Sequence, residues 1–312
     1  MKKKEILIIG NGCPFMKSLC AALRNKYGLS GVVTAGKTLA TDILLDTANR
    51  QELEQLLGAN SIRQIYFLEG LTIEGETAGK DHAGEFPFRS LPGIFEAAVK
   101  YRVEKVFWAG NITLSMDIAS GTLAYIDYWC NFYFQKLRLD IRGIRFPFIL
   151  SPGSEECGPM SSYVETACRY ALEKRAYTCF FAEDTFLPWI FLPDALRAVL
   201  EFMDAPKEQL KFSTVYDVNG MAFAPCDLAD EICRQLPGFN ITFQPDRRDH
   251  LARQLSATLS CDNAQRDWGW KPAYNLERTV AAIIRSIAPE PGFPLPPGQA
   301  RQLYEFYPHE TF

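Results

Sequence analysis

Residues 4–16 read KEILIIGNGCPFM, an apolar run that enters a turn containing two glycines. Residues 4–9 have the length and apolar content of a short buried strand. Residues 17–27 follow with apolar side chains at helical spacing. A strand, a glycine turn and a helix in this order predict the first unit of a parallel α/β sheet.

The same alternation continues as far as residue 150. We expect further strands at residues 31–34, 62–68, 103–109 and 141–150. We expect helices in the stretch after Asp46 and at residues 94–101 and 123–139. Strands that alternate with helices predict a parallel sheet covered on both faces, and right-handed crossovers then give a doubly wound Rossmann arrangement.

The composition changes after Ser151, where a loop rich in serine, glycine and proline extends to Pro159. Beyond it we expect a helix at 162–175, a return to the sheet at 189–203 and 213–218, and a smaller cap made from 225–236, 240–244 and 276–287. The predicted organisation is a Rossmann domain (1–151 and about 187–222), a smaller C-terminal α/β substrate-type domain (about 152–186 and 223–288) and a tail (289–312). The proline-rich tail holds five aromatic residues, which favours packing against another surface.

The composition is that of a globular protein, because 47% of the 312 residues are apolar and 22% are charged. The net charge is -4, and the longest run of basic residues is Lys2–Lys4. Binding to nucleic acid requires a basic surface, so no nucleic-acid partner is expected. No apolar run approaches the roughly 20 residues of a membrane-spanning helix, so no membrane association is expected.

Cysteine and histidine usage points to a reducing compartment and away from metal binding. The nine cysteines include no C-x-x-C pair, so we expect free thiols in the cytoplasm. The three histidines, His82, His250 and His309, are far apart in the sequence. No metal site is therefore expected.

Several motifs in the second half of the chain carry a family resemblance. They are Arg145-Phe146-Pro147, residues 177–180 (YTCF), 182–185 (AEDT), 193–198 (PDALRA) and 267–272 (DWGWKP). With these motifs the chain resembles the extended short-chain dehydrogenase/reductases, also called the NAD-dependent epimerase/dehydratase family, and in particular the short-chain-type L-threonine 3-dehydrogenases. The likeness runs from about Ile6 to Ile287 and implies a Rossmann fold; function has to be argued from the site.

The resemblance implies a G-x-x-G-x-x-G turn that lets the backbone approach the cofactor pyrophosphate. The matching positions are Gly10, Cys13 and Met16. Cys13 places a side chain where the phosphate approaches, and Met16 adds bulk where helix and strand need close contact. If the motif is instead aligned on Gly10 and Gly12, Phe15 stands at the position of the third glycine, so this alignment is no better. The alternative interpretation is that residues 11–14 form an ordinary turn before a helix.

The ribose site of the family needs an acidic residue at the end of the second strand. Residues 32–37 read VVTAGK, without Asp or Glu. Lys37 suits a 2′-phosphate or is an ordinary surface lysine, and Asp46 matches a family position near the adenine or caps the following helix. NAD and NADP are both candidate cofactors. The alternative is that the chain binds no dinucleotide.

The resemblance also implies a catalytic serine, tyrosine and lysine, with the tyrosine and lysine four residues apart on one helix. Asn111 stands in the place of the serine, and an amide cannot relay a proton as a hydroxyl can. Thr113 is a hydroxyl two residues out of place. Counting back from Arg145 without gaps puts the tyrosine and lysine positions at Ala119 and Leu123.

Taking Tyr125 as the tyrosine puts Trp129 where the lysine belongs. Asn111, Thr113 and Tyr125 are therefore the catalytic candidates if the chain is active. On the substrate side, the family has a loop rich in glycine and threonine before a tyrosine that corresponds to Tyr163. Here residues 158–162 read GPMSS, so this loop is only partly kept, and we take Ser161, Ser162 and Tyr163 as lining a substrate cleft.

The predicted helix 123–139 carries aromatic residues on several sides, which indicates burial on several sides. In extended family members the matching helix packs against a second subunit, so the resemblance implies a homodimer, with simple core packing as the alternative.

Two functions stay open. One is a catalytically degenerate relative that binds a nucleotide or metabolite, or regulates a partner. The other is a working NAD(P)-dependent oxidoreductase or epimerase that acts on an amino acid or nucleotide sugar.

Overall fold

The computed structural model describes residues 4–71, 89–111, 119–153, 159–210, 215–254 and 260–288. Thr113 and the tail 289–312 lie outside these residues. The N-terminal part is built on a seven-stranded parallel sheet in the order β10-β6-β5-β4-β1-β2-β3. The strands are β1 (Ile6–Ile9), β2 (Val32–Gly36), β3 (Ile43–Leu44), β4 (Gln64–Phe67), β5 (Lys105–Asn111), β6 (Asp140–Phe146) and β10 (Val215–Asp217).

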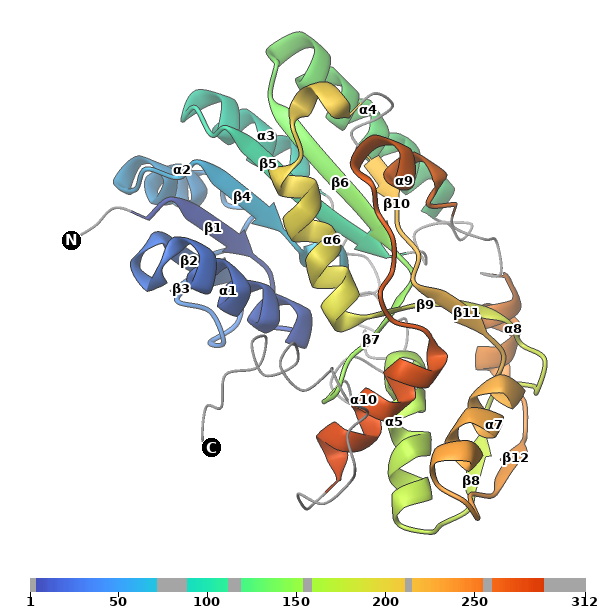
Figure 1. Cartoon of the computed structure of the whole chain (residues 1–312). Helices are drawn as coiled ribbons and strands as arrows, with labels where there is room; N and C mark the ends of the chain where they lie inside the picture. The colour runs from blue at the N-terminus through green and yellow to red at the C-terminus, as the bar shows by residue number, and fades with distance from the viewer. Residues whose placement is uncertain are drawn as a thin grey trace.

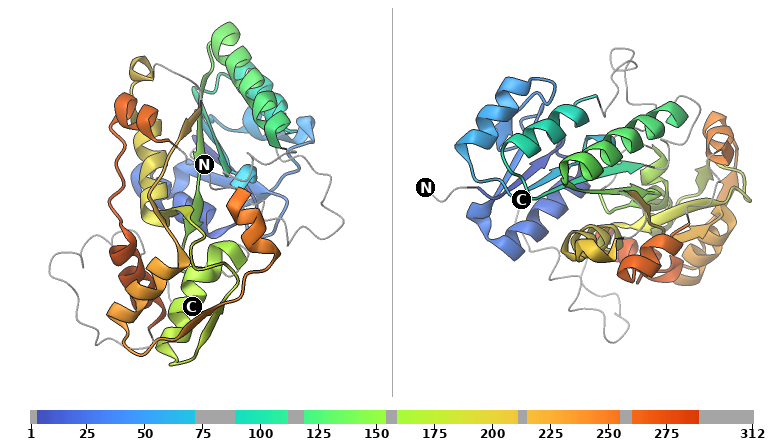
Figure 2. Two further views of the ribbon diagram at one scale, coloured as in Figure 1. Left: turned by 90° about the vertical axis from the view of Figure 1, so that its right-hand side faces the viewer. Right: turned by 90° about the horizontal axis from the view of Figure 1, so that it is seen from above.

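Helices cover both faces of this sheet (Figure 2). One face packs against α1 (Pro14–Tyr27) and α6 (Leu192–Asp204), and the other against α2 (Arg50–Ala59), α3 (Leu91–Lys100) and α4 (Ala119–Leu137). The central strands are buried on both sides, which explains why they read as continuous apolar runs rather than alternating ones. The predicted α/β class with a doubly wound parallel sheet is confirmed.

The C-terminal part lies beside the carboxyl end of the sheet, at the lower right of Figure 1. Its core is formed by the helices α5 (Pro159–Leu172), α7 (Pro225–Gln235) and α10 (Leu276–Ile287), with α8 (Arg247–Gln254) beside them. Two small sheets complete it, one ordered β11-β9-β7 and one formed by β12 and β8. Their strands are β7 (Phe148–Leu150), β8 (Tyr177–Cys179), β9 (Leu187–Phe191), β11 (Met221–Phe223) and β12 (Ile241–Phe243). The exact domain bounds stay a prediction.

Two sequence-based expectations about strands were wrong. The strand expected at 141–150 is divided at Pro147 into β6, in the large sheet, and β7, in a small one. Proline has no amide hydrogen to continue a ladder, so the chain changes sheets there. The return expected at 189–203 does not join the large sheet either, because β9 pairs with β7 and β11. The return at 213–218 is correct, since β10 pairs with β6.

Two helix boundaries also differ from expectation. Helix α4 begins at Ala119 and ends at Leu137. Helix α2 is capped by Asn49 and not by Asp46, because the Asn49 side chain accepts hydrogen bonds from the backbone amides of Gln51 and Glu52. Within the described ranges, no helix is both long and apolar enough to cross a membrane.

Candidate functional site

The candidate site lies at the carboxyl edge of the sheet, where the strand order reverses between β1 and β4. Doubly wound folds bind ligands at this point because the loops after adjacent strands leave in opposite directions. Gly10 follows β1, Gly36 ends β2, Glu69 follows β4, and Asn111 ends β5. Because all of these strands are parallel, the four residues lie along one edge.

The glycine loop after β1 is filled from its inner side by Met16. The backbone amide of Gly12 donates a hydrogen bond to the Met16 sulfur at 3.3 Å. A methyl group added to Gly10 would lie 2.9 Å from the same sulfur. Met16 is only 2% exposed and belongs to the core under α1. The amide of Gly12 is thus already satisfied within the chain.

The outer side of the loop is covered by residues 37–42, which we call the covering segment. The Thr38 hydroxyl donates to the carbonyl oxygen of Asn11 at 3.3 Å. Gly12 has a φ of +81°, and a methyl group on it would lie 2.6 Å from the Ala40 side chain. Gly36, where the segment starts, packs so closely on the Gly10 carbonyl oxygen that any side chain would collide with it. The loop and the segment are in direct contact along their length.

Asp42 fixes the far end of the covering segment. Its carboxylate accepts the backbone amide of Thr34 at 2.9 Å, and its own amide donates to the Thr34 hydroxyl at 2.8 Å. Arg24 of α1 forms an ion pair with the same carboxylate at 2.8 Å. Burial tends to raise the pKa of Asp42, but the hydrogen bonds from Thr34 and the charge of Arg24 outweigh it and lower the pKa. The carboxylate therefore stays ionised and keeps these bonds at neutral pH.

Cys13 stands at the N-cap position of α1 and is partly buried. Burial raises the pKa of its thiol, and the nearby backbone amides of Met16 and Phe15 oppose this shift without cancelling it. Pro14 is the first residue of the helix and has no amide hydrogen. The start of α1 therefore carries a neutral thiol and a reduced set of free amide donors.

Two pairs of side chains occupy the edge next to the loop. Lys37 pairs with Asp46 at 3.3 Å, and Asp46 also accepts the backbone amide of Ala48 at 3.1 Å. The bond from Ala48 and the charge of Lys37 lower the pKa of Asp46. The Thr47 hydroxyl lies 3.1 Å and 3.2 Å from the two carboxylate oxygens of Glu69. Carboxylates thus stand at the ends of both β3 and β4.

A cavity of about 250 Å³ opens beside these pairs, between the N-termini of α2 and α3. It is lined by Thr47, Ala48, Arg50, Leu53, Arg89, Ser90 and Gly93. The side chain of Arg50 is already paired with Glu54 and Glu96 at 2.9 Å. The volume lies just below the ~300–1,000 Å³ that is usual for small-molecule sites.

The catalytic candidates are spread over different surroundings. Asn111 is 6% exposed at the end of β5, and Thr113 lies outside the described residues. Tyr125 is half-buried on α4, and its ring centre lies 6.2 Å from that of Trp129. Both rings pack against the core between the sheet and helices α2 to α4. Ala119, at the position expected for the tyrosine, is the first residue of α4.

The substrate-side candidates lie on α5. Tyr163 is only 2% exposed and packs against Phe181 and Trp189, with ring centres 5.3 Å away in each case. Burial holds the pKa of its phenol well above the usual value. Tyr163 thus packs in the core of the C-terminal part, and its place beside a substrate cleft stays a prediction. Ser162 is buried, and Ser161 lies on the same helix with a side chain outside the described set.

The chain was compared with known proteins, and no family model matches it. It is 34% identical to the mitochondrial L-threonine 3-dehydrogenase of Sus scrofa over 154 residues, which are 49% of this chain and 41% of that protein. An uncharacterized epimerase/dehydratase of Staphylococcus saprophyticus is 27% identical over 319 residues, covering 91% of this chain and 97% of that one. The GalE-like L-threonine dehydrogenase of Cupriavidus necator in its holo form superimposes with a TM-score of 0.81 and 29% identity, over 90% of this chain and 99% of that one.

The chain is a homologue of the epimerase/dehydratase and L-threonine 3-dehydrogenase proteins. The aligned region spans less than half of the length of the mitochondrial relatives. In this chain, a bound dinucleotide would need free loop amides and room for its phosphates beside the backbone. The Gly12 amide is engaged by Met16, and Ala40 covers the loop. The residues present do not fit a dinucleotide held through its pyrophosphate at this loop.

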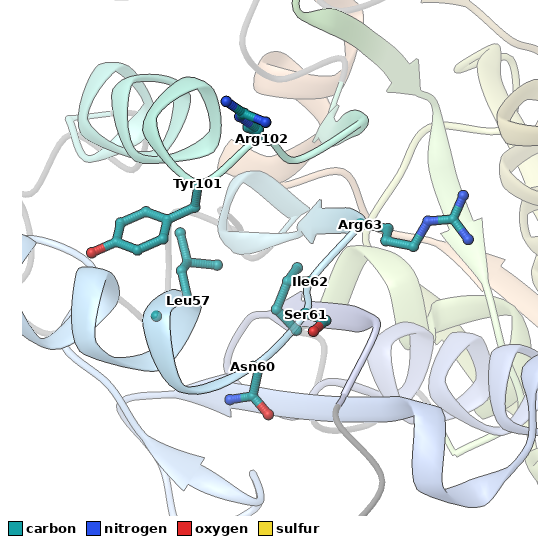
Figure 3. A pocket seen from close by; sticks show the side chains of 8 residues that line it. Leu57, Asn60, Ser61, Ile62, Arg63, Tyr101 and Arg102 are labelled. Carbon is teal, nitrogen blue, oxygen red and sulfur yellow. The ribbon is translucent and has the colours of Figure 1, made fainter.

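A second cavity, about 370 Å³ in volume, lies at the opposite edge of the sheet, before β4 and β5. Figure 3 shows that the side chains of Tyr101, Arg63 and Arg102 on its rim point in different directions. Arg63 is paired with Glu104 at 2.8 Å and 3.0 Å. Polar groups that do not converge are a poor basis for a specific site.

Glu69 and residues 38–42 of the covering segment were not among the predicted site residues. Glu69 directly follows a predicted strand, so an acidic residue at the carboxyl edge could have been noticed from that position. The fold of the covering segment depends on contacts with Asn11 and Thr34 that no local pattern encodes. Within the described residues, no group of three His, Cys, Asp or Glu side chains could hold a metal ion.

Proposed function

We propose that this chain is a catalytically degenerate relative of the epimerase/dehydratase and L-threonine dehydrogenase proteins that acts through binding or regulation. The observation that carries the proposal is the make-up of α4, the helix on which the family places its catalytic pair. Ala119 and Leu123 stand at the two positions, and no tyrosine of α4 is followed by a lysine four residues later. In the family, a lysine four residues after the tyrosine lowers the pKa of that tyrosine so that it can act as a base, and α4 has no tyrosine and lysine at this spacing.

The residue at the end of β5 supports the same proposal. Asn111 offers an amide oxygen and an NH₂ group, which can hold a carbonyl or hydroxyl in place. An amide does not exchange protons with a substrate at neutral pH. The end of β5 therefore lacks the hydroxyl with which the family relays a proton, while the carboxylates of Asp46 and Glu69 at the same edge are held by Lys37 and Thr47.

We propose the cavity between α2 and α3 as the place where a small ligand is bound. It lies on the same edge as Asn111 and is lined by the polar side chains of Thr47, Ser90 and Arg89. Its volume of about 250 Å³ suits a metabolite or single nucleoside better than a whole dinucleotide.

The deciding experiment is a turnover assay on the full-length purified chain. NAD⁺ or NADP⁺ would be supplied with L-threonine, and reduction of the nicotinamide would be followed by its absorbance. UDP-glucose and UDP-galactose would be tested for epimerisation by chromatography. The expected result is no rate above that of buffer, for the wild type and for a Tyr125→Phe variant.

A substrate-dependent rate that disappears in Tyr125→Phe would sink the proposal. It would establish instead a working NAD(P)-dependent oxidoreductase or epimerase that uses Tyr125 without a lysine. A rate that survives in Tyr125→Phe would also contradict the proposal and would direct attention to Asn111, with Asn111→Ala as the next variant.

We also propose that the chain forms a homodimer through α4. Tyr128 is 63% exposed and Phe132 is 40% exposed on this helix, one turn apart. Trp129 lies edge-on to both, with ring centres 5.3 Å and 6.0 Å away. Large aromatic side chains that remain exposed and contiguous on a monomer are typical of the centre of a protein interface.

A further inference from the structure

We propose that the chain closes its own pyrophosphate loop, with Met16 on the inner side and the covering segment (residues 37–42) on the outer side. In this arrangement protein atoms take the contacts that dinucleotide phosphates would make. The inference is independent of catalysis, since a silent relative could still bind a dinucleotide.

The inner contact engages one of the backbone amides of the glycine loop. A glycine loop binds phosphate because its amides point outward and nothing covers the α carbons. Here the amide of Gly12 points to the Met16 sulfur at 3.3 Å. The sulfur also lies against Gly10, so it occupies the inner side of the turn. An entering phosphate would have to displace a core side chain.

The outer contact is held at both of its ends. At its start, Gly36 packs against the Gly10 carbonyl, and Thr38 donates to the Asn11 carbonyl. At its end, Asp42 exchanges two hydrogen bonds with Thr34 and pairs with Arg24. The segment between these anchors carries Ala40 onto Gly12. Since the anchors are hydrogen bonds to β2 and to the loop itself, the cover is part of the folded structure.

The charges at this edge act in the same direction as the contacts. The Glu69 carboxylate stands beside Thr47 after β4. Lys37, the cation at the start of the covering segment, is paired with Asp46. A pyrophosphate would meet a carboxylate and a lysine that is already neutralised by its partner, which weakens its attraction to this edge.

The first test is direct binding to the wild-type full-length chain. NADH and NADPH would be titrated by calorimetry, and melting temperature would be measured at increasing NADH. We expect no binding of either dinucleotide below about millimolar concentration and no rise in melting temperature, because only a ligand that binds the folded state stabilises it. Micromolar binding of NADH or NADPH would overturn the proposal. If such binding occurred without turnover, the degenerate function would stand while the closed loop would not.

The second test opens the loop. The double variant Cys13→Gly/Met16→Gly restores glycine at the family positions, and we expect NADH to bind at least about tenfold more tightly than to the wild type, a gain of about 1.4 kcal/mol. The matched control is Cys20→Gly, which adds glycine to the same buried helix away from the loop. It should be destabilised as well but should gain no affinity. Equal affinities in the double variant, the control and the wild type would overturn the proposal.

A third measurement covers the case in which the double variant does not fold. Hydrogen exchange of the Gly12 amide in the wild type should be slow, because its bond to the Met16 sulfur lies under Ala40. The Asp42→Ala variant removes the side chain that anchors the covering segment, and Asp42 lies at the surface. The variant should speed this exchange at least about tenfold without global unfolding. Fast exchange in the wild type, or no change in Asp42→Ala, would show that the segment does not cover the loop.

Discussion

The Asp194 carboxylate accepts the backbone amide of Ala273 at 2.9 Å and 3.1 Å, although the two residues are 79 positions apart. The same carboxylate accepts the amide of Tyr274 at 2.9 Å and pairs with Arg197. Asp194 opens α6, which packs on the large sheet, and Ala273 precedes α10 of the C-terminal part. The motif at residues 193–198 therefore has a structural role, because it holds the segment that leads into α10. Its Arg197 also donates to the carbonyl oxygen of Lys271, in the motif at residues 267–272.

Replacing Asp194 should lower the stability of the whole chain. Asp194 is 1% exposed, so Asp194→Ala leaves the partly buried amides of Ala273 and Tyr274 without this acceptor and takes one of its partners from the Arg197 guanidinium. We expect a loss of about 1–3 kcal/mol in the free energy of unfolding, measured by urea denaturation. Asp194→Asn keeps one acceptor oxygen and should lose less. The control Asp230→Ala, on the exposed side of α7, should stay within about 0.5 kcal/mol of the wild type.

The parts of the fold that sequence predicted are those in which a local pattern determines the outcome. The apolar run of β1 is buried on both faces wherever the strand lies in a parallel sheet, so its pattern alone identifies it. The partner of β9 could not be predicted in this way. Its residues are as apolar as those of β1, and only the change of direction at Pro147 puts β7 beside it.

For the candidate site, the sequence predicted only the positions at which a residue type that the family needs is replaced by another. The absence of glycine at Met16 and of lysine at Leu123 can be read directly from the sequence. What fills the loop depends on a sulfur contact with Gly12 and on a segment anchored through Thr34. These contacts join residues whose local patterns are unrelated, so they become visible only in three dimensions.

Acid should destabilise the C-terminal part through Asp249. Burial tends to raise its pKa, but hydrogen bonds from Thr185, from the Ala182 amide and from Arg253 lower the pKa below its usual value. A carboxyl group with a lower pKa in the folded state stabilises above its unfolded pKa, about 3.9, and loses that contribution as the pH falls through the folded pKa. Asp249→Asn should therefore flatten the dependence of unfolding free energy on pH below about 4, measured by urea titration.

A second variant separates this effect from general damage. Thr185→Val removes one of the hydrogen bonds that lower the Asp249 pKa, while a side chain of similar size is kept. It should reduce stability at neutral pH and shift the acid-induced loss to a higher pH. If both variants kept the acid slope of the wild type, another carboxyl group would be responsible.

The thiols should react in an order set by their surroundings. Cys226 is exposed at the start of α7, whereas Cys168 and Cys179 lie in the core of the C-terminal part. Burial raises the pKa of Cys179 to about 11 and also raises that of Cys168. Only the thiolate reacts with iodoacetamide, so peptide mapping should show Cys226 labelled before the other cysteines in the described part of the chain, and the two buried thiols labelled only on unfolding.

Cys226→Ser provides the control for this order. It should remove the fastest labelling and leave the circular dichroism spectrum and urea midpoint unchanged, because the side chain is at the surface. Labelling of Cys168 in the native protein at the rate of Cys226 would show that the core around α5 opens readily. The closed packing described for Tyr163 would then need revision.

The proposed homodimer predicts that the exposed aromatic residues of α4 control the molecular mass in solution. Tyr128→Ser/Phe132→Ser removes the two exposed rings, and sedimentation equilibrium should change from dimer to monomer, with a dissociation constant at least about 100-fold weaker. Both side chains face solvent in the monomer, so its fold should be preserved. The control Phe186→Ser removes another exposed ring, 53% exposed and away from α4, and should leave the mass unchanged. A wild-type chain that sediments as a monomer would contradict the proposal. A dimer that persists in the α4 variant would place the interface on another surface. The exposed aromatic residues around Trp129 would then have to be explained by contact with a protein other than a second copy of this chain.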